Sequence, residues 1–229
     1  MNETVIFTVN VIICSFIVAV HLDRRAMERE KVGDITKCFL IPSLYSTLFT
    51  ASKAFPREIA RPWMLLLITV FYTLGDIQLL EKKPFWRFVA GAVSFALGHL
   101  MYVLYFSYYG QNIFTLLGGM ILFGVPFIYV VRYVLAKKSI KFGLGAILYA
   151  FILYLFGVGM CAVFSFEYLK TSLLVFVGVC LFMFSDGKIA LRALKGEKKY
   201  TSFIIMLTYI AANVCLVLGV WCINVPVAS

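Results

Sequence analysis

The stretch Thr201–Ile223, TSFIIMLTYIAANVCLVLGVWCI, runs for 23 residues without a charged side chain. The hydrocarbon core of a bilayer is about 30 Å thick, and about 20 largely apolar residues cross it as an α-helix. A helix also satisfies its own backbone hydrogen bonds, as lipid requires. We therefore expect this stretch to be a transmembrane helix.

Seven similar stretches precede it, so the chain reads as an all-α membrane protein with eight transmembrane helices in one bundle, a single domain over residues 1–229. Pro62 and Pro84 fall at span starts, where a missing backbone N–H costs little. Pro42 and Pro126 fall inside spans and predict kinks or wide turns. The seven expected spans are approximately 5–22, 35–55, 62–80, 85–108, 113–135, 140–164 and 171–191.

The composition excludes an ordinary soluble domain. Hydrophobic residues make up 62% of the chain and charged residues 14%, whereas soluble domains carry about 25% charged residues. The net charge of +10 comes from short basic segments between apolar stretches. Insertion into a membrane and anionic lipid headgroups explain these segments, so we expect no nucleic-acid partner.

The distribution of Lys and Arg predicts the topology. Seventeen of the 21 basic residues fall in the odd-numbered linkers between spans, which the positive-inside rule assigns to the cytoplasm. Both termini are then non-cytoplasmic. The start of the chain carries Glu3 and no basic residue before the first span, which indicates a retained helix rather than a signal peptide. The remaining four basic residues are Lys53, Arg57, Arg61 and Lys170.

Cysteine and histidine give no sign of a metal site or cofactor. None of the six cysteines forms a CxxC pair, so they read as small hydrophobic residues. Two histidines, His21 and His99, cannot make a three-histidine zinc site. A carboxylate-rich metal site stays open, and we expect no metal or cofactor.

Two acidic residues, Asp76 and Asp186, lie well inside expected spans, in their cytoplasmic third. An ionisable group at mid-membrane costs about 2.5–3.5 kcal/mol or more unless it is paired or hydrated. Thr69, Tyr72 and Thr73 share a helical face with Asp76, at i, i+3, i+4 and i+7. This face is expected to meet a cavity or the bundle interior, although both aspartates could instead serve as hydrogen bonds between helices.

Five further polar residues accompany the aspartates. Lys37 is the nearest candidate counter-ion, or a side chain that extends to the headgroups. The other four could support a site or simply satisfy one another inside the bundle. They are His99 with Tyr102 one turn on, and Tyr209 with Asn213 on one face of the last span.

A faint internal repeat links Leu74-Gly75-Asp76 to Phe184-Ser185-Asp186, four spans later and in the same direction. It suggests a parallel duplication of four helices plus four.

The chain resembles the YhhN-like lysoplasmalogenase family from about residue 36 to 215. No single motif is specific, but five occur in the right order on the right helices. They are Thr36-Lys37, Leu74-Gly75-Asp76-Ile77 with Leu79, Gly98-His99-Leu100-Met101-Tyr102, Phe182-Met183-Phe184-Ser185-Asp186 and Tyr209-Ile210-Ala211-Ala212-Asn213. Two features depart from the family: Asn213 replaces a usual Gln, and the stretch 187–192 is more basic, which leaves headgroup preference open.

The resemblance implies hydrolysis of the vinyl-ether bond of lysoplasmalogens to a fatty aldehyde and a glycerophospho-alcohol. Protonation of the outer alkene carbon and attack by water need an acid and a nearby carboxylate, much as in glycosidases. The two aspartates suit this chemistry, with a slight preference for Asp76 as the acid. Lys37 would orient an aspartate or meet the lipid phosphate, and Tyr72, His99 and Asn213 would position water or substrate.

Two other functions remain open at this stage. A small proton-coupled transporter would use the same aspartates and histidine as an ion relay, and a non-catalytic protein would only bind lipid. The expected partners are a lysophospholipid and the bilayer, with the site towards the cytoplasm. Either a bacterial inner membrane or the endoplasmic reticulum fits, and the sequence leaves the oligomeric state open.

Overall fold

Eight α-helices follow one another along the chain in the computed structural model, which describes residues 2–27, 30–55, 57–80, 85–136, 140–195 and 200–223. The regular secondary structure of these ranges is helical, as predicted. The helices are α1 (Glu3–Ala26), α2 (Glu30–Ala54), α3 (Pro62–Gln78), α4 (Phe85–Ser107), α5 (Ile113–Ala136), α6 (Ile140–Ala162), α7 (Leu169–Lys195) and α8 (Thr201–Ile223).

The helix ends differ from the predicted spans mainly on the side of the basic linkers. α1 continues four residues past the expected end at Leu22, α2 begins five residues early, and α7 ends four residues late. Hydrophobicity marks the part of a helix that meets lipid, whereas the hydrogen-bonded helix can continue into the polar interface. The predicted spans are therefore the apolar sections of longer helices.

Six of the described helices, α1, α4, α5, α6, α7 and α8, are long and apolar enough to cross a membrane. The chain thus fits an integral, multi-pass membrane protein. α3 is apolar but has 17 residues, and α2 begins with the charged positions Glu30, Lys31, Asp34 and Lys37. Crossing by these two helices, and hence the count of eight spans, stays a prediction.

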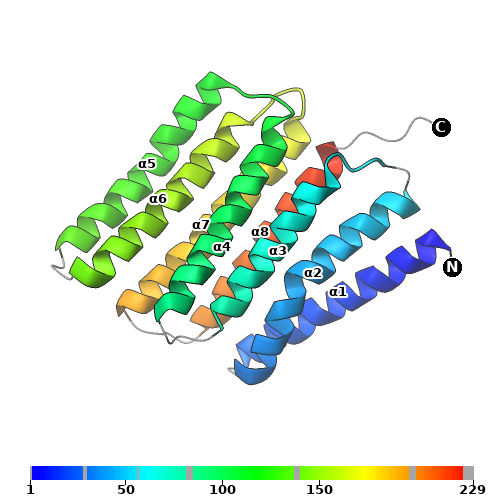
Figure 1. Ribbon diagram of the computed structural model, residues 1–229, viewed down its shortest axis with the longest axis horizontal. Helices are drawn as coiled ribbons and strands as arrows, with labels where there is room; N and C mark the ends of the chain where they lie inside the picture. The colour runs from blue at the N-terminus through cyan, green and yellow to red at the C-terminus, as the bar shows by residue number, and fades with distance from the viewer. Residues whose placement is uncertain are drawn as a thin grey trace.

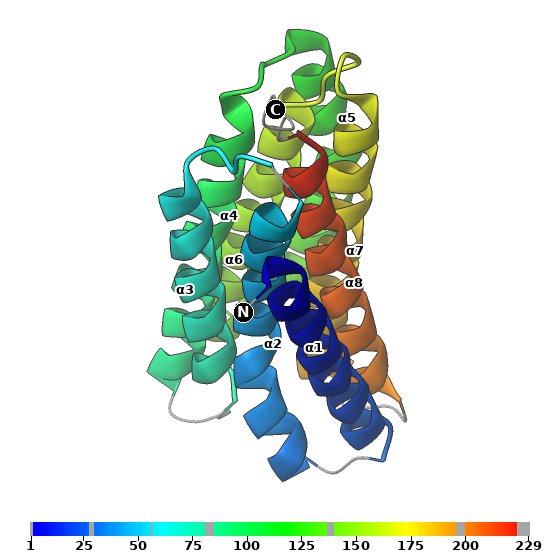
Figure 2. The same ribbon diagram turned by 90° about the vertical axis from the view of Figure 1, so that its right-hand side faces the viewer.

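The helices form a bundle with consecutive pairs packed against each other. α1 packs on α2, α3 on α4, α5 on α6, and α7 on α8. α5 and α6 lie at one side and α1 and α2 at the other, with α3, α4, α7 and α8 between them (Figure 1). The turned view separates α3 on one side from α7 and α8 on the other, with α2 between them (Figure 2). Contacts of α8 with α1, α2 and α7 place it among other helices.

All four odd-numbered helices end at the same end of the bundle, where the basic linkers attach, and α1 begins and α8 ends at the opposite end (Figure 1). We call these the basic end and the terminal end. Some of the basic residues used for the topology lie outside the described residues, as does Pro84. They are Arg29, Lys82, Lys83, Lys137, Lys138, Lys198 and Lys199.

The internal prolines do not interrupt their helices. α2 runs through Pro42 and α5 through Pro126, so neither causes a wide turn. Pro62 is the first residue of α3, as predicted.

Aromatic side chains fill the middle of the bundle. Tyr45, Tyr72, Tyr102, Tyr105 and Phe182 are among the largest fully buried side chains. They come from α2, α3, α4 and α7, so these helices meet around one core. The face of this core towards the basic end carries the buried acidic residues.

Candidate active site

Asp76 lies on the last turn of α3 and is 1% exposed. The Lys37 ammonium, from α2, is 3.1 Å from Asp76 Oδ1. The Tyr209 hydroxyl, from α8, donates a hydrogen bond to Asp76 Oδ2 at 2.8 Å. Side chains from two helices, α2 and α8, thus contact the two oxygens of one buried carboxyl group on α3, and Lys37 is its counter-ion, as the sequence suggested.

Asp186 occupies a different environment on α7. It is 5% exposed, and its Oδ2 accepts a hydrogen bond from the Tyr149 hydroxyl of α6 at 2.6 Å. Among the side chains that the structure describes, no Lys, Arg or His lies within ion-pairing distance of Asp186. The two carboxyl groups are therefore buried alike but paired differently.

The sequence did not indicate Tyr149. A signal was present, because Tyr149 precedes the buried residues Leu153, Phe156 and Met160 of α6 at the spacing of one helical face. The partner of Tyr149 lies on another helix, 37 residues further along the chain, and a single sequence gives no means of pairing the two.

The two aspartates belong to one electrostatic cluster, which we call the carboxyl cluster: Lys37, Asp76, Tyr149, Asp186 and Tyr209. Asp186 lies within electrostatic reach of both Lys37 and Asp76. Tyr209 is within reach of both aspartates. The structure thus brings together, near the basic end, four site residues that the sequence proposed and adds Tyr149 to them.

Tyr72 connects this cluster to the aromatic core. It is fully buried one turn before Asp76, and its hydroxyl has no hydrogen-bond partner among the described residues. It lies within electrostatic reach of Asp76, Asp186 and Tyr149. A buried hydroxyl without a partner costs free energy, so a bound water or substrate atom would satisfy it.

His99 and Tyr102 lie in the aromatic core and do not contact either aspartate through a hydrogen bond. The His99 ring stacks on Phe156, with ring centroids 4.1 Å apart, and neither ring nitrogen has a hydrogen-bond partner in the part of the chain that the structure describes. The Tyr102 hydroxyl instead pairs with Tyr45 of α2. Sequence reasoning missed Tyr45, which lies in the second expected span.

The side chain of Asn213 makes its hydrogen bond within its own helix and not to either carboxyl group. Its amide nitrogen donates to the backbone carbonyl of Tyr209 at 2.9 Å, and its side-chain oxygen is buried without a hydrogen-bond partner among the residues that the structure describes. Asn213 thus lies one turn from the carboxyl cluster, with one polar atom still available.

Two glycines of the quoted motifs allow α3 and α4 to approach. A Cβ atom at Gly98 would lie 2.3 Å from carbon atoms of the Tyr72 ring, and one at Gly75 would lie 2.8 Å from the Phe95 ring. Both positions therefore require glycine with the present packing. On α7, the Ser185 hydroxyl donates to the Ile205 carbonyl of α8 at 3.0 Å, which fixes the neighbouring Asp186 relative to α8.

No group of three or more His, Cys, Asp or Glu side chains in the described part of the chain is placed to hold a metal ion. All six cysteines are free thiols.

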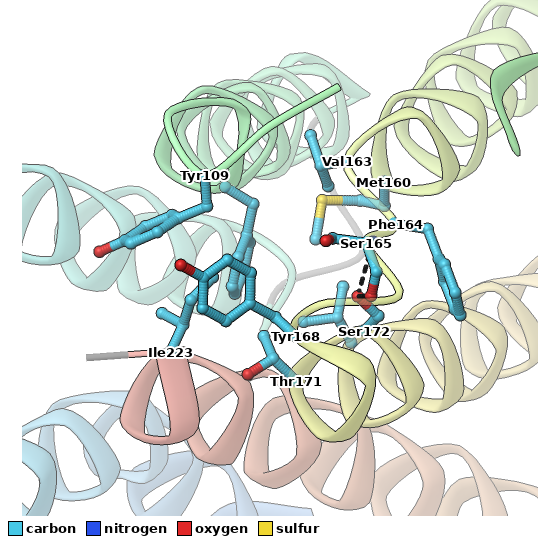
Figure 3. Close-up of a pocket in the computed structure, with 11 residues that line it drawn as sticks. Tyr109, Met160, Val163, Phe164, Ser165, Tyr168, Thr171, Ser172 and Ile223 are labelled. Atoms are coloured by element: carbon cyan, nitrogen blue, oxygen red, sulfur yellow. Dashed lines mark hydrogen bonds between the residues drawn. The ribbon is translucent and has the colours of Figure 1, made fainter. Parts of the chain in front are cut away.

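A small cavity lies at the terminal end, because its lining includes Ile223, the last residue of α8. Figure 3 shows its lining residues. Its volume is about 10 Å³, which is room for about one water molecule. Tyr168, Ser165 and Ser172 are among its lining residues, and Ser172 Oγ bonds to the backbone N–H and carbonyl of Ser165. The cavity therefore contains hydroxyl groups but no ionisable acid.

The model of the YhhN family matches residues 33–220. The chain belongs to the YhhN family. The match begins near the start of α2 and ends within α8, so it includes every residue of the carboxyl cluster and leaves out the whole of α1. No curated protein and no solved structure matches this YhhN-family chain.

Proposed function

We propose that this YhhN-family protein is an intramembrane hydrolase that cleaves the vinyl-ether bond of lysoplasmalogens. The products are a fatty aldehyde and glycerophosphocholine or glycerophosphoethanolamine. Family membership is consistent with this type of reaction. The observation that carries the proposal is the carboxyl cluster, in which aspartates from α3 and α7 share one buried, Lys37-containing site.

The reaction needs two carboxyl groups in different protonation states. One gives a proton to the outer alkene carbon, which leaves an oxocarbenium ion at the carbon bonded to oxygen. The other, as a carboxylate, stabilises this cation and accepts a proton from the attacking water, as in glycosidases. The resulting hemiacetal collapses to the aldehyde and the free glycerol hydroxyl. No metal or cofactor enters these steps.

The depth of the cluster suits a lysophospholipid. Asp76 lies one turn or less from the end of α3, so a lipid whose headgroup lies at that end would present its first chain bonds at this level. The carboxyl groups are only 1% and 5% exposed, so binding requires the helices to part. Lys37, with a side chain 13% exposed, and the partly buried Tyr149 are the members nearest the surface.

The test measures aldehyde release by the purified protein in nanodiscs or detergent. The substrate is an alkenyl lysophospholipid, and an alcohol dehydrogenase consumes the aldehyde in a coupled assay. We expect turnover by the unmodified protein and loss of most activity in Asp76→Asn and in Asp186→Asn. Asp23→Asn is a matched control, because this side chain is 48% exposed and pairs with Arg24.

Other results would favour the alternatives. Near-normal aldehyde release by both cluster variants would contradict the two-carboxyl mechanism. Binding of the lipid without turnover would indicate a lipid-binding protein. Substrate-dependent proton movement across proteoliposomes, without turnover, would indicate a transporter.

A further inference from the structure

The two aspartates of the carboxyl cluster have different partners. Asp76 has a cation, the Lys37 ammonium, 3.1 Å from Oδ1, and a phenol on Oδ2. Asp186 has the Tyr149 phenol on Oδ2, and no described cation lies within ion-pairing distance of it. This asymmetry distinguishes the two aspartates by their surroundings, which the sequence alone does not show.

The partners correspond to two different chemical roles. A buried carboxylate needs a counter-charge, and Asp76 has one in direct contact. Its Oδ1 lies in the ion pair with Lys37 and its Oδ2 accepts the hydrogen bond from Tyr209, an environment that fits an ionised carboxylate. Asp186 is also buried, and among the described side chains its donor is a neutral phenol. Of the two, Asp186 is the group whose surroundings fit a protonated carboxylic acid.

We infer that Asp186 is the proton donor of the pair, that Asp76 is the carboxylate that activates water, and that Tyr149 positions the donor. This inference rests on the proposed function and reverses the preference that the sequence gave. Tyr149 belongs to no motif that carries the family resemblance. It is a positioning residue, because it acts through Asp186.

The hydrogen bond of Tyr149 also selects an atom. Since the phenol donates to Oδ2 of Asp186, the carboxylic proton is carried by Oδ1. Oδ1 is thus the atom that faces the alkene when substrate binds. Without the phenol the carboxyl group can rotate and exchange its two oxygens. The acidic proton then points at the outer alkene carbon in a smaller fraction of the enzyme–substrate complexes.

The steps balance with these roles. The Asp186 O–H bond breaks as a C–H bond forms at the outer alkene carbon, which leaves an Asp186 carboxylate and the oxocarbenium ion. Water attacks this ion and gives a proton to the Asp76 carboxylate. The hemiacetal then returns its hydroxyl proton to Asp186, the C–O bond to glycerol breaks, and Asp76 gives its proton to the leaving oxygen. Both residues end as they began.

Deuterium exchange distinguishes donor from base. In D₂O, Asp76→Asn should still protonate the alkene through Asp186, but water attack is slowed, so the cation returns its proton or deuteron. Recovered substrate should then contain deuterium at the outer vinyl carbon, detected by mass spectrometry. Asp186→Asn should show neither exchange nor turnover. Exchange in Asp186→Asn, or in neither variant, overturns the assignment.

Tyr149→Phe and Tyr209→Phe form a matched pair, because each removes one phenol from one aspartate. We expect Tyr149→Phe to lower kcat about tenfold, with KM unchanged and without vinyl deuterium in recovered substrate. This corresponds to one hydrogen bond to a reacting carboxyl group. Tyr209→Phe should instead produce deuterated substrate. A Tyr149→Phe variant that exchanges, or that changes KM alone, contradicts its positioning role.

Two controls separate this inference from the proposed function. If the unmodified protein releases no aldehyde from a vinyl-ether lysolipid, the proposed function fails first. If it releases aldehyde but exchange follows the opposite pattern, only the role assignment fails. Asp76→Asn leaves Lys37 without a counter-charge and can destabilise the protein. The double variant Lys37→Gln with Asp76→Asn removes both charges. It should show the same deuterium exchange while its thermal unfolding in detergent is normal.

Discussion

The buried ion pair between Lys37 and Asp76 should contribute to the stability of the protein. The side chains are 13% and 1% exposed. Removing one partner of a buried ion pair costs about 3–5 kcal/mol, because the other charge stays buried and unpaired. Lys37→Met should therefore lower the melting temperature in detergent and abolish aldehyde release.

A double-mutant cycle separates the two effects. Lys37→Met with Asp76→Asn removes both charges and should regain most of the lost thermal stability without regaining activity. Lys53→Met is the matched control, since Lys53 is exposed near the other end of the same helix. If Lys37→Met melts like the unmodified protein, the ion pair contributes nothing to stability and Lys37 extends to the headgroups instead.

The polar face of α3 that was predicted from the sequence shows what helical periodicity can and cannot predict. Tyr72 and Asp76 are buried as expected. Thr69 and Thr73 lie at the edge of that face and donate their hydroxyls to backbone carbonyls four residues earlier in the same helix, those of Leu65 and Thr69. Threonine can satisfy itself locally, whereas a carboxyl group needs a partner elsewhere. The acidic residue was therefore the reliable part of the pattern.

At the scale of helices, the close packing of α3 on α4 makes Gly98 a sensitive position. A Cβ atom there would lie 2.3 Å from Tyr72 ring atoms, and the neighbour is a fully buried ring rather than a flexible chain end. Overpacking of this kind costs about 1–3 kcal/mol. Gly98→Ala should lower the melting temperature and, by displacing Tyr72, reduce aldehyde release.

Gly118→Ala on α5 is the control for this change. A Cβ atom at Gly118 meets nothing within 4 Å, and alanine is the better helix former by about 0.5–1 kcal/mol. Its melting temperature should stay the same or rise. Equal effects of the two substitutions would mean that α4 shifts to accommodate the methyl group at Gly98.

The existence of the helices could be predicted from the sequence because lipid imposes long apolar stretches on any chain that crosses it. The pairing between helices could not. Tyr149 and Tyr45 each hydrogen-bond to a residue of another helix, 37 and 57 positions away. Tyrosine is common at membrane interfaces, so the residue type alone gave no reason to place Tyr149 or Tyr45 inside the bundle.

For the whole molecule, the arrangement of partners bears on the predicted duplication. Lys37 on α2 pairs with Asp76 on α3, and Tyr149 on α6 pairs with Asp186 on α7. A four-plus-four repeat would make α2 equivalent to α6 and α3 to α7. The two pairs then occupy corresponding helices but differ in charge. The duplication stays a prediction. If it occurred, the partners of the two aspartates must have diverged, because one is a lysine and the other a tyrosine.

The topology is the prediction that concerns the whole chain. Basic residues cluster at one end of the bundle, and two of the four at the other end are held by aromatic rings. The guanidinium groups of Arg57 and Arg61 lie 4.8 Å and 3.5 Å from the rings of Trp221 and Tyr108. Seventeen of the 21 basic residues belong to the odd-numbered linkers, so the other four give little counterweight under the positive-inside rule.

Fusions in a bacterial host test this arrangement, because alkaline phosphatase is active only outside the cytoplasm and green fluorescent protein fluoresces only inside it. Phosphatase fused after residue 58 or residue 229 should be active, and after residue 82 or residue 197 inactive, with fluorescence showing the opposite pattern. The fusion after residue 58 is decisive for α2. With α2 across the membrane it must be active, whereas an α2 that only lies in the interface would leave it inactive and place Lys37 outside the hydrocarbon core.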